Sequence, residues 1–170
     1  MLEKMGWDGD WSLKAINDSG ENALVVAISN QLPEVEEMIE KGSDVNIKDN
    51  LGWTPLIHLA LTHSFTDAEQ SQNVLSIIKK MVSRGADMNH KDNEGNPVIF
   101  YAFDNPVIFS HFLECGANPF LPNDKGDTCL MKALDDKNHE ILSILRPYVD
   151  KENLEEFIPN AVYQKTNKRL

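Results

Sequence analysis

Four short segments of this chain share one pattern, and their spacing limits the folds that the chain can adopt. Each segment has Asn or Asp three residues before a glycine and leucine or isoleucine four residues after it. The four glycines are Gly20, Gly52, Gly95 and Gly126, with spacings of 32, 43 and 31 residues. Self-similarity at a period of roughly 20 to 50 residues is typical of stacked repeat architectures. The sequence therefore predicts four similar structural units in a row.

Each unit has the pattern of a turn followed by two short helices. Asn or Asp near Gly indicates a turn, because Gly adopts positive φ freely and the Asx side chain binds its own backbone. In the second unit we expect Thr54 to cap a helix that begins at Pro55. Three units end their second, outer helix at another glycine, in GSDVN (42–46), GADMN (85–89) and GANPF (116–120). Helices this short are unstable alone, so neighbouring units must bury a shared apolar face.

The stretch NPVIFYAFDNPVIF, residues 96–109, contains one pentapeptide twice. Its uncharged run, 97–103, is far shorter than the roughly 20 residues that span a membrane. We predict an inner helix over 98–103 and an outer helix that is capped by Asn105 and begins at Pro106. The two copies then represent two helix starts, and no membrane association is expected.

The segments Gly52-Trp53-Thr54-Pro55-Leu56 and Gly85-Ala86-Asp87-Met88-Asn89 resemble the ankyrin repeat, and the likeness covers residues 17–149. The resemblance implies an all-α solenoid of stacked helix-turn-helix units with short hairpin tips and terminal caps. The family's His after Thr-Pro-Leu is Ile57 here, and His58 follows one place later, so its usual hydrogen bond is not assumed. The expected organisation is an N-terminal cap (1–16), repeats at 17–48, 49–91, 92–122 and 123–149, and a C-terminal capping helix with a tail (150–170).

The two glycines of the second unit are 33 positions apart in sequence, against 22 positions in the first unit. The additional polar segment is HSFTDAEQSQN, residues 63–73. We expect it to lengthen the loop between the helices or to add a helical turn on either side. It is interpreted as an insertion tolerated at the surface, and the alternative is a binding element.

Composition excludes several classes of function. The chain carries 27 acidic against 16 basic residues, a net charge of −11, which repels nucleic acid and anionic lipid. Its two cysteines fit a reducing interior, and we expect a cytoplasmic protein. Cys129 is expected to be small and buried, and Cys115 to be more exposed.

The sequence lacks the common motifs of catalytic, nucleotide and metal sites, so we expect no enzyme activity, no cofactor and no metal. His58 and His63 are five residues apart, the wrong spacing for two ligands on one helical face. A zinc site assembled from distant histidines and cysteines is kept as a minor alternative. An enzyme would need a pocket that converges on His58, Cys115 or the pair Asp135-Asp136.

The resemblance implies that partners bind at the turn tips and at the exposed ends of the inner helices, along one concave side. The 20 residues at these positions include eight acids and one base. Leu51 and Trp53 lie at one tip, where an exposed Trp would anchor a partner, and the alternative is that Trp53 packs back onto the stack. The predicted partner-binding residues are Asp18, Glu21, Leu51, Trp53, Glu94, Asn96, Asp104, Asp124, Asp127, Asp135 and Asp136.

The leading hypothesis is a non-catalytic protein-protein interaction module, monomeric when free, that binds a partner with a basic surface through this acidic face. One alternative is an inhibitor or immunity-type protein that neutralises a single basic partner such as a toxin or nuclease. Another is a regulatory subunit of a larger enzyme complex. The sequence does not separate these three roles.

Overall fold

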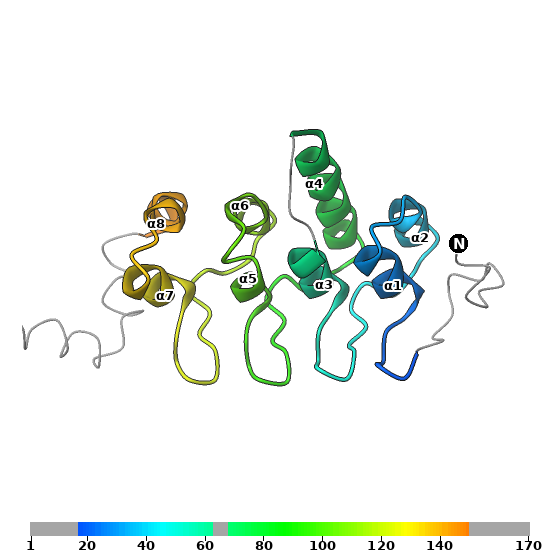
Figure 1. The fold of residues 1–170 in the computed structure, drawn as a ribbon, viewed down its shortest axis with the longest axis horizontal. Coiled ribbons are helices and arrows are strands. Elements are labelled where there is room, and N and C mark those ends of the chain that lie inside the picture. The colour runs from blue at the N-terminus through cyan, green and yellow to red at the C-terminus, as the bar shows by residue number, and fades with distance from the viewer. Residues whose placement is uncertain (1–16, 63–67, 150–170) are drawn as a thin grey trace, which may run out of the picture.

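The computed structural model describes residues 17–62 and 68–149, and in this part of the chain the helices form four pairs in a row (Figure 1). The inner helices are α1 (Ala23–Ser29), α3 (Pro55–Thr62), α5 (Val98–Tyr101) and α7 (Cys129–Asp135). The outer helices are α2 (Val35–Glu40), α4 (Ala68–Ser83), α6 (Pro106–Glu114) and α8 (His139–Leu145), which is followed by the 3₁₀ helix η2 (Arg146–Tyr148). The described residues contain no β-strand, only an isolated bridge between Lys91 and Pro97. The predicted all-α class is confirmed.

The inner helices lie in one row, the outer helices in a second row, and the four turns project away from both (Figure 1). Helix α1 packs against α3 and α3 against α5, while α2, α4, α6 and α8 contact one another in succession. A continuous apolar core runs between the two rows, and Met38, Ile78, Phe109 and Phe112 are completely buried in it. Since the described helices other than α4 have at most nine residues and are too short to be stable alone, this shared core holds the units together.

The four turns have the same hydrogen bonds. In the second unit, Asp49 Oδ1 accepts from the backbone N–H groups of Leu51 (2.8 Å) and Trp53 (2.9 Å), and the Gly52 N–H donates to the Asp49 carbonyl (2.9 Å). The corresponding bonds recur at the other three turns, which start at Asn17, Asp92 and Asn123. One Asx side chain therefore fixes each tip, as the repeated pattern predicts.

The second glycine of a unit ends its outer helix. Gly85, with φ of 85°, donates its N–H to the Val82 carbonyl, and the Ala86 N–H donates to the Met81 carbonyl. The same pair of bonds occurs at Gly42 and Gly116, so the predicted helix ends are confirmed. The loop that follows also connects units, because the Asn46 side chain donates to the Gly85 carbonyl (2.7 Å) and accepts from the Asp87 N–H (2.9 Å).

The two copies of Asn-Pro-Val-Ile-Phe begin two different helices. Helix α6 has Asn105 as its N-cap, whose side chain accepts from the Ile108 N–H, and Pro106 in its first turn, as predicted. Helix α5 ends at Tyr101, two residues earlier than predicted. Pro106 disfavours helical backbone at the residue before it, so Asn105 is extended. The chain therefore leaves the helix after Tyr101 and turns through Ala102 and Phe103 to reach this extended N-cap.

The insertion of the second unit lengthens its outer helix. Helix α4 has 16 residues, against 6 to 9 in the other outer helices, and includes residues 68–73 of the predicted insertion. It extends beyond its neighbours in Figure 1. Toward its C-terminal end, Lys80 binds Glu36 (2.7 Å) and Glu40 of α2. Residues 63–67 lie outside the described residues.

The predicted cap of α3 is only partly correct. The carbonyl of Thr54 accepts from the N–H groups of Ile57 and His58, as at a helix start, but its Oγ1 is buried without a hydrogen-bond partner. In α7 the equivalent Thr128 does cap its helix, since its Oγ1 accepts from the Met131 N–H (3.2 Å).

These two threonines give a matched test of capping. We expect Thr54→Val to leave the free energy of unfolding unchanged or slightly higher, because the hydroxyl that it removes makes no bond in the interior. Thr128→Val should lower that free energy by about 1 kcal/mol, because it removes a cap bond. Urea denaturation followed by circular dichroism measures both, and an equal loss in the two variants would contradict the difference in their bonding.

The predicted N-terminal cap, 1–16, and the predicted C-terminal helix and tail, 150–170, lie outside the described residues. Among the helices that the structure describes, none has the length and apolar character needed to cross a bilayer.

Candidate functional site

The predicted partner-binding residues lie at the turn tips and at the C-terminal ends of inner helices, a surface that we call the tip face. The exposed members are Asp18, Leu51, Glu94, Asp104, Asp124, Asp127, Asp135 and Asp136. The half-buried members are Glu21, Trp53 and Asn96. Most of the predicted acids are thus accessible to a partner.

Hydrogen bonds between successive turns hold the first three tips together. The Asn50 backbone N–H donates to the Ser19 carbonyl (2.9 Å), and its side chain donates to the Asp18 carbonyl (2.8 Å). In the next turn Asn93 repeats this arrangement, since its backbone N–H donates to the Leu51 carbonyl and its side chain to the Asn50 carbonyl (3.0 Å). The tips are therefore fixed relative to one another by backbone as well as by side-chain contacts.

The contacts between the third and fourth tips are made by side chains. Asn123 Nδ2 donates to Asn96 Oδ1 (3.5 Å), and Lys91 Nζ lies 3.7 Å from Asp124 Oδ1. Bonds of this length and exposure are weak. The fourth tip is therefore held less firmly than the first three.

Most of the negative charge on the tip face is not neutralised by a basic side chain. Within the described residues, two of the eight predicted acids form ion pairs with lysine, Asp124 with Lys91 and Asp136 with Lys132. The other six are Asp18, Glu21, Glu94, Asp104, Asp127 and Asp135. The tip face therefore retains a strong negative potential, which favours cationic ligands.

Trp53 is not the fully exposed anchor that its place at a tip suggested. Its ring packs edge-on against His58 (centroids 5.6 Å apart) and against Tyr101 (5.4 Å), so it joins the second unit to the third. This is the alternative in which Trp53 packs back onto the stack. Leu51 beside it is 54% exposed.

Two further apolar side chains are exposed at the ends of inner helices. Leu61 at the end of α3 is 49% exposed, and Leu134 at the end of α7 is 47% exposed. Leu61 occupies one of the 20 positions expected to contact a partner, but neither residue was in the list of predicted partner-binding residues. Leucine at the otherwise polar ends of the inner helices was the signal in the sequence that could have identified them. Together with Leu51 they add apolar contact area to the acidic tip face.

The carboxyl group of Asp92, buried behind the third tip, is paired. Asp92 accepts hydrogen bonds from the Tyr101 hydroxyl and from the N–H groups of Glu94 and Asn96. Burial alone would raise the pKa of the Asp92 carboxyl, but these bonds outweigh it and hold the pKa below its usual value. Burial and the Asp92 charge also raise the pKa of Tyr101. Asp92 therefore stays charged, and it supports the turn.

The two cysteines are free, as the sequence indicated. Cys129 is completely buried, and burial raises the pKa of its thiol to about 12. Cys115 is half-buried, and burial raises the pKa of its thiol as well. A nucleophilic cysteine needs a lowered pKa, so the environments of both thiols disfavour that role.

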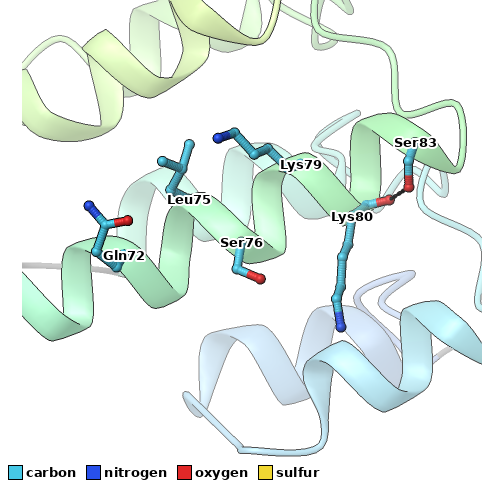
Figure 2. Close-up of a pocket in the computed structure, with 6 residues that line it drawn as sticks. All are labelled: Gln72, Leu75, Ser76, Lys79, Lys80 and Ser83. Atoms are coloured by element: carbon cyan, nitrogen blue, oxygen red, sulfur yellow. Dashed lines mark hydrogen bonds between the residues drawn. The ribbon is translucent and has the colours of Figure 1, made fainter.

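A shallow pocket of about 380 Å³ lies on α4, away from the tip face (Figure 2). It is lined by Gln72, Leu75, Ser76, Lys79, Lys80 and Ser83. Lys80 points toward α2 in Figure 2, where its ammonium binds Glu36 and Glu40. The pocket contains none of the predicted site residues, and its lining combines neither a carboxylate nor a histidine with its hydroxyl groups.

No protein-family model matches the chain, and no curated protein matches it significantly.

Proposed function

We propose that this protein is a non-catalytic protein-binding module of the ankyrin-repeat type, and that its tip face binds a partner with a basic surface. The repeat type is supported by the hydrogen bonds of the four turns, which recur from unit to unit, and by the pairs of inner and outer helices. The two free cysteines fit a reducing compartment, and a cytoplasmic location is part of the proposal.

The observation that carries the binding proposal is the combination of charge and fixed geometry on the tip face. Six exposed or half-buried carboxylates lack a lysine or arginine partner in the described part of the chain, and backbone hydrogen bonds fix the spacing of the first three tips. The negative electrostatic potential of the tip face would raise the association rate of a partner with a basic surface. Because the tips are already fixed, they would lose little conformational entropy on binding. The exposed leucines of this face would add apolar contact area to the charge interactions; they are Leu51, Leu61 and Leu134.

The test is a charge reversal on the tip face with a matched reversal elsewhere. The tip variant carries Asp18→Lys, Glu94→Lys and Asp127→Lys, which are exposed acids without a lysine partner among the described residues on the first, third and fourth tips, and the control carries Glu37→Lys, Glu114→Lys and Glu140→Lys on the outer helices. Both variants change three exposed acids and shift the net charge equally. We expect recovery of a partner that binds the wild-type protein to fall at least about tenfold for the tip variant and to be unchanged for the control.

Affinity chromatography with quantitative mass spectrometry measures this recovery, and repeating it at higher salt should weaken the wild-type interaction because exposed charges are screened. Equal recovery with both variants would remove the tip face as the binding surface. Equal loss with both would show that net charge, and not this face, governs the interaction.

A further inference from the structure

Three equivalent side chains occur at each junction between successive units. The first is the residue directly after the first glycine of the earlier unit. The second is the Asn or Asp that begins the turn of the later unit, and the third lies nine positions after that Asn or Asp. At the second junction these are Trp53, Asp92 and Tyr101, and at the third they are Asn96, Asn123 and Lys132. At the first junction they are Glu21, Asp49 and His58. The same backbone positions thus carry three different sets of chemical groups.

The first junction brings three potential metal ligands together. One ligand atom from each of Glu21, Asp49 and His58 lies within 4.8 Å of the other two. His58 Nε2 and Asp49 Oδ2 are hydrogen-bonded to each other at 3.0 Å, and the two side chains are only 9% and 6% exposed. Glu21 is half-buried, so the group can be reached from solvent on its side.

The charges of the three junctions differ in a way that points to a cation. The second junction has one carboxylate, Asp92, and a tyrosine hydroxyl donates to it. The third has no carboxylate, and its Lys132 pairs with Asp136. The first has two carboxylates beside one imidazole, so two negative charges lie within 4.8 Å of each other and of a nitrogen that can ligate a metal ion.

We propose that Glu21, Asp49 and His58 bind a divalent first-row transition-metal ion of the Zn²⁺ type. One imidazole nitrogen and two carboxylate oxygens form a ligand set suited to such ions, whereas Mg²⁺ and Ca²⁺ prefer oxygen ligands alone. Two donor atoms on a tetrahedral zinc ion lie about 3.3 to 3.5 Å apart. Nε2 and Oδ2 are 3.0 Å apart in their hydrogen bond, so they need to separate only slightly to receive an ion in place of the shared proton.

The surrounding bonds leave the required atoms in suitable positions. Asp49 Oδ1 holds the N–H groups of Leu51 and Trp53, which fixes the carboxylate and directs Oδ2 toward His58. One oxygen of Glu21 accepts from Asn17 (2.7 Å), and the other is the oxygen that we assign to the ion. The Glu21 oxygen lies within 4.8 Å of the other two ligand atoms, and rotation about the three rotatable bonds of this half-buried side chain can bring it to the ion. Water would complete the coordination.

The ion would join the first unit to the second, because Glu21 belongs to one and Asp49 and His58 to the other. This proposal does not depend on partner binding at the tip face. It also differs from the sequence expectation of no metal, and from the minor alternative of a zinc site built from distant histidines and cysteines, because two of its three ligands are carboxylates. The three ligands lie on two turns and one helix, and the folded stack brings them together.

The chain itself provides suitable variants for the test. Asp49→Asn replaces the metal-binding oxygen with an amide, and asparagine already holds the same turn at Asn17 and Asn123, so the fold should be kept. Glu21→Gln removes the second carboxylate at a position where the third unit has Asn96. Asp92→Asn makes the same exchange as Asp49→Asn one unit further along, away from the ligands, and is the control.

Isothermal titration with zinc chloride, in buffer with physiological salt, measures affinity and stoichiometry for the full-length protein. We expect one Zn²⁺ per chain for the wild type and for Asp92→Asn, and at least about tenfold weaker binding for Asp49→Asn and Glu21→Gln. Excess magnesium should not compete. Circular dichroism of each variant checks that it folds. If Asp49→Asn does not fold, the zinc affinity of Glu21→Gln alone tests the proposal.

Three results would overturn the proposal. The first is the absence of one-to-one zinc binding by the wild type. The second is wild-type affinity in both ligand variants, which would place the ion elsewhere on the acidic surface. The third is an equal loss of affinity in Asp92→Asn and Asp49→Asn, which would show that total charge and not this cluster determines binding.

Discussion

Replacing Phe112 with alanine is expected to lower the free energy of unfolding by about 3 to 5 kcal/mol. Phe112 on α6 is completely buried, so the change removes a large apolar side chain and leaves a cavity that its neighbours only partly fill. The effect should be large in the third unit, because its inner helix α5 has only four residues. The packing of this unit therefore depends mainly on α6.

The position of Phe112 also predicts how the variant unfolds. In a stack where each unit contacts only its neighbours, weakening the third unit should uncouple the fourth from the first two. We expect amide hydrogens of α7 and α8 to exchange faster than those of α1 and α2 in Phe112→Ala, with similar protection of the two pairs in the wild type. Hydrogen exchange resolved by residue, together with urea denaturation, measures both effects.

Phe100→Ala is the matched control, since Phe100 belongs to the same unit but is only half-buried. Its free energy of unfolding should fall by roughly 1 kcal/mol, and uniform exchange along the stack should remain. A loss in Phe112→Ala no greater than in this control, or equal acceleration of exchange in all four units, would contradict the dependence of the third unit on α6.

The local signals of this sequence were sufficient to predict the units. An Asx residue three positions before a glycine specifies the same turn bonds at Asn17, Asp49, Asp92 and Asn123 because the side chain and backbone that make those bonds are adjacent in sequence. The second glycines and the Asn105-Pro106 helix start are local in the same sense. Each of these features depends on a few residues, so the pattern alone could indicate them.

Features that depend on packing were predicted only as alternatives, or wrongly. The bonding of the Thr54 hydroxyl depends on what surrounds it after packing, and the sequence shows only that threonine is a common cap. The exposure of Trp53 depends on Tyr101, which belongs to the next unit. The inserted residues had two predicted outcomes, and the contacts of α4 with α2 and α6 support the longer helix.

The candidate sites show the same division. The exposure of most predicted acids on the tip face follows from their places in turns, which lie at the surface in almost any fold. The cluster of Glu21, Asp49 and His58 combines two units, and the spacing of residues along one helix does not reveal it. Aligning the four units position by position would have shown that Glu21, Asp49 and His58 occupy the same positions as Trp53, Asp92 and Tyr101. The difference in residue type at these positions could then have identified the cluster.

The tip face depends on the close contact between successive turns, and Gly52→Ala is the substitution that tests this contact most directly. Gly52 has φ of 80°, and an added Cβ would lie 2.7 Å from the backbone nitrogen of Asn93 in the next turn. That nitrogen donates to the Leu51 carbonyl, so it cannot move away without losing the bond between the tips. We expect the variant to lose at least about 3 kcal/mol of unfolding free energy, from left-handed backbone strain and from this clash.

Gly85→Ala separates the two causes. Gly85 has nearly the same backbone angle, φ of 85°, but no atom lies within 4 Å of an added Cβ, so only the backbone strain of about 1 kcal/mol applies. Urea denaturation of both variants gives the difference, which we assign to the contact between the second and third tips. Equal losses in the two variants would mean that the tips can separate at little cost, and the fixed spacing of carboxylates that the binding proposal requires would then be absent.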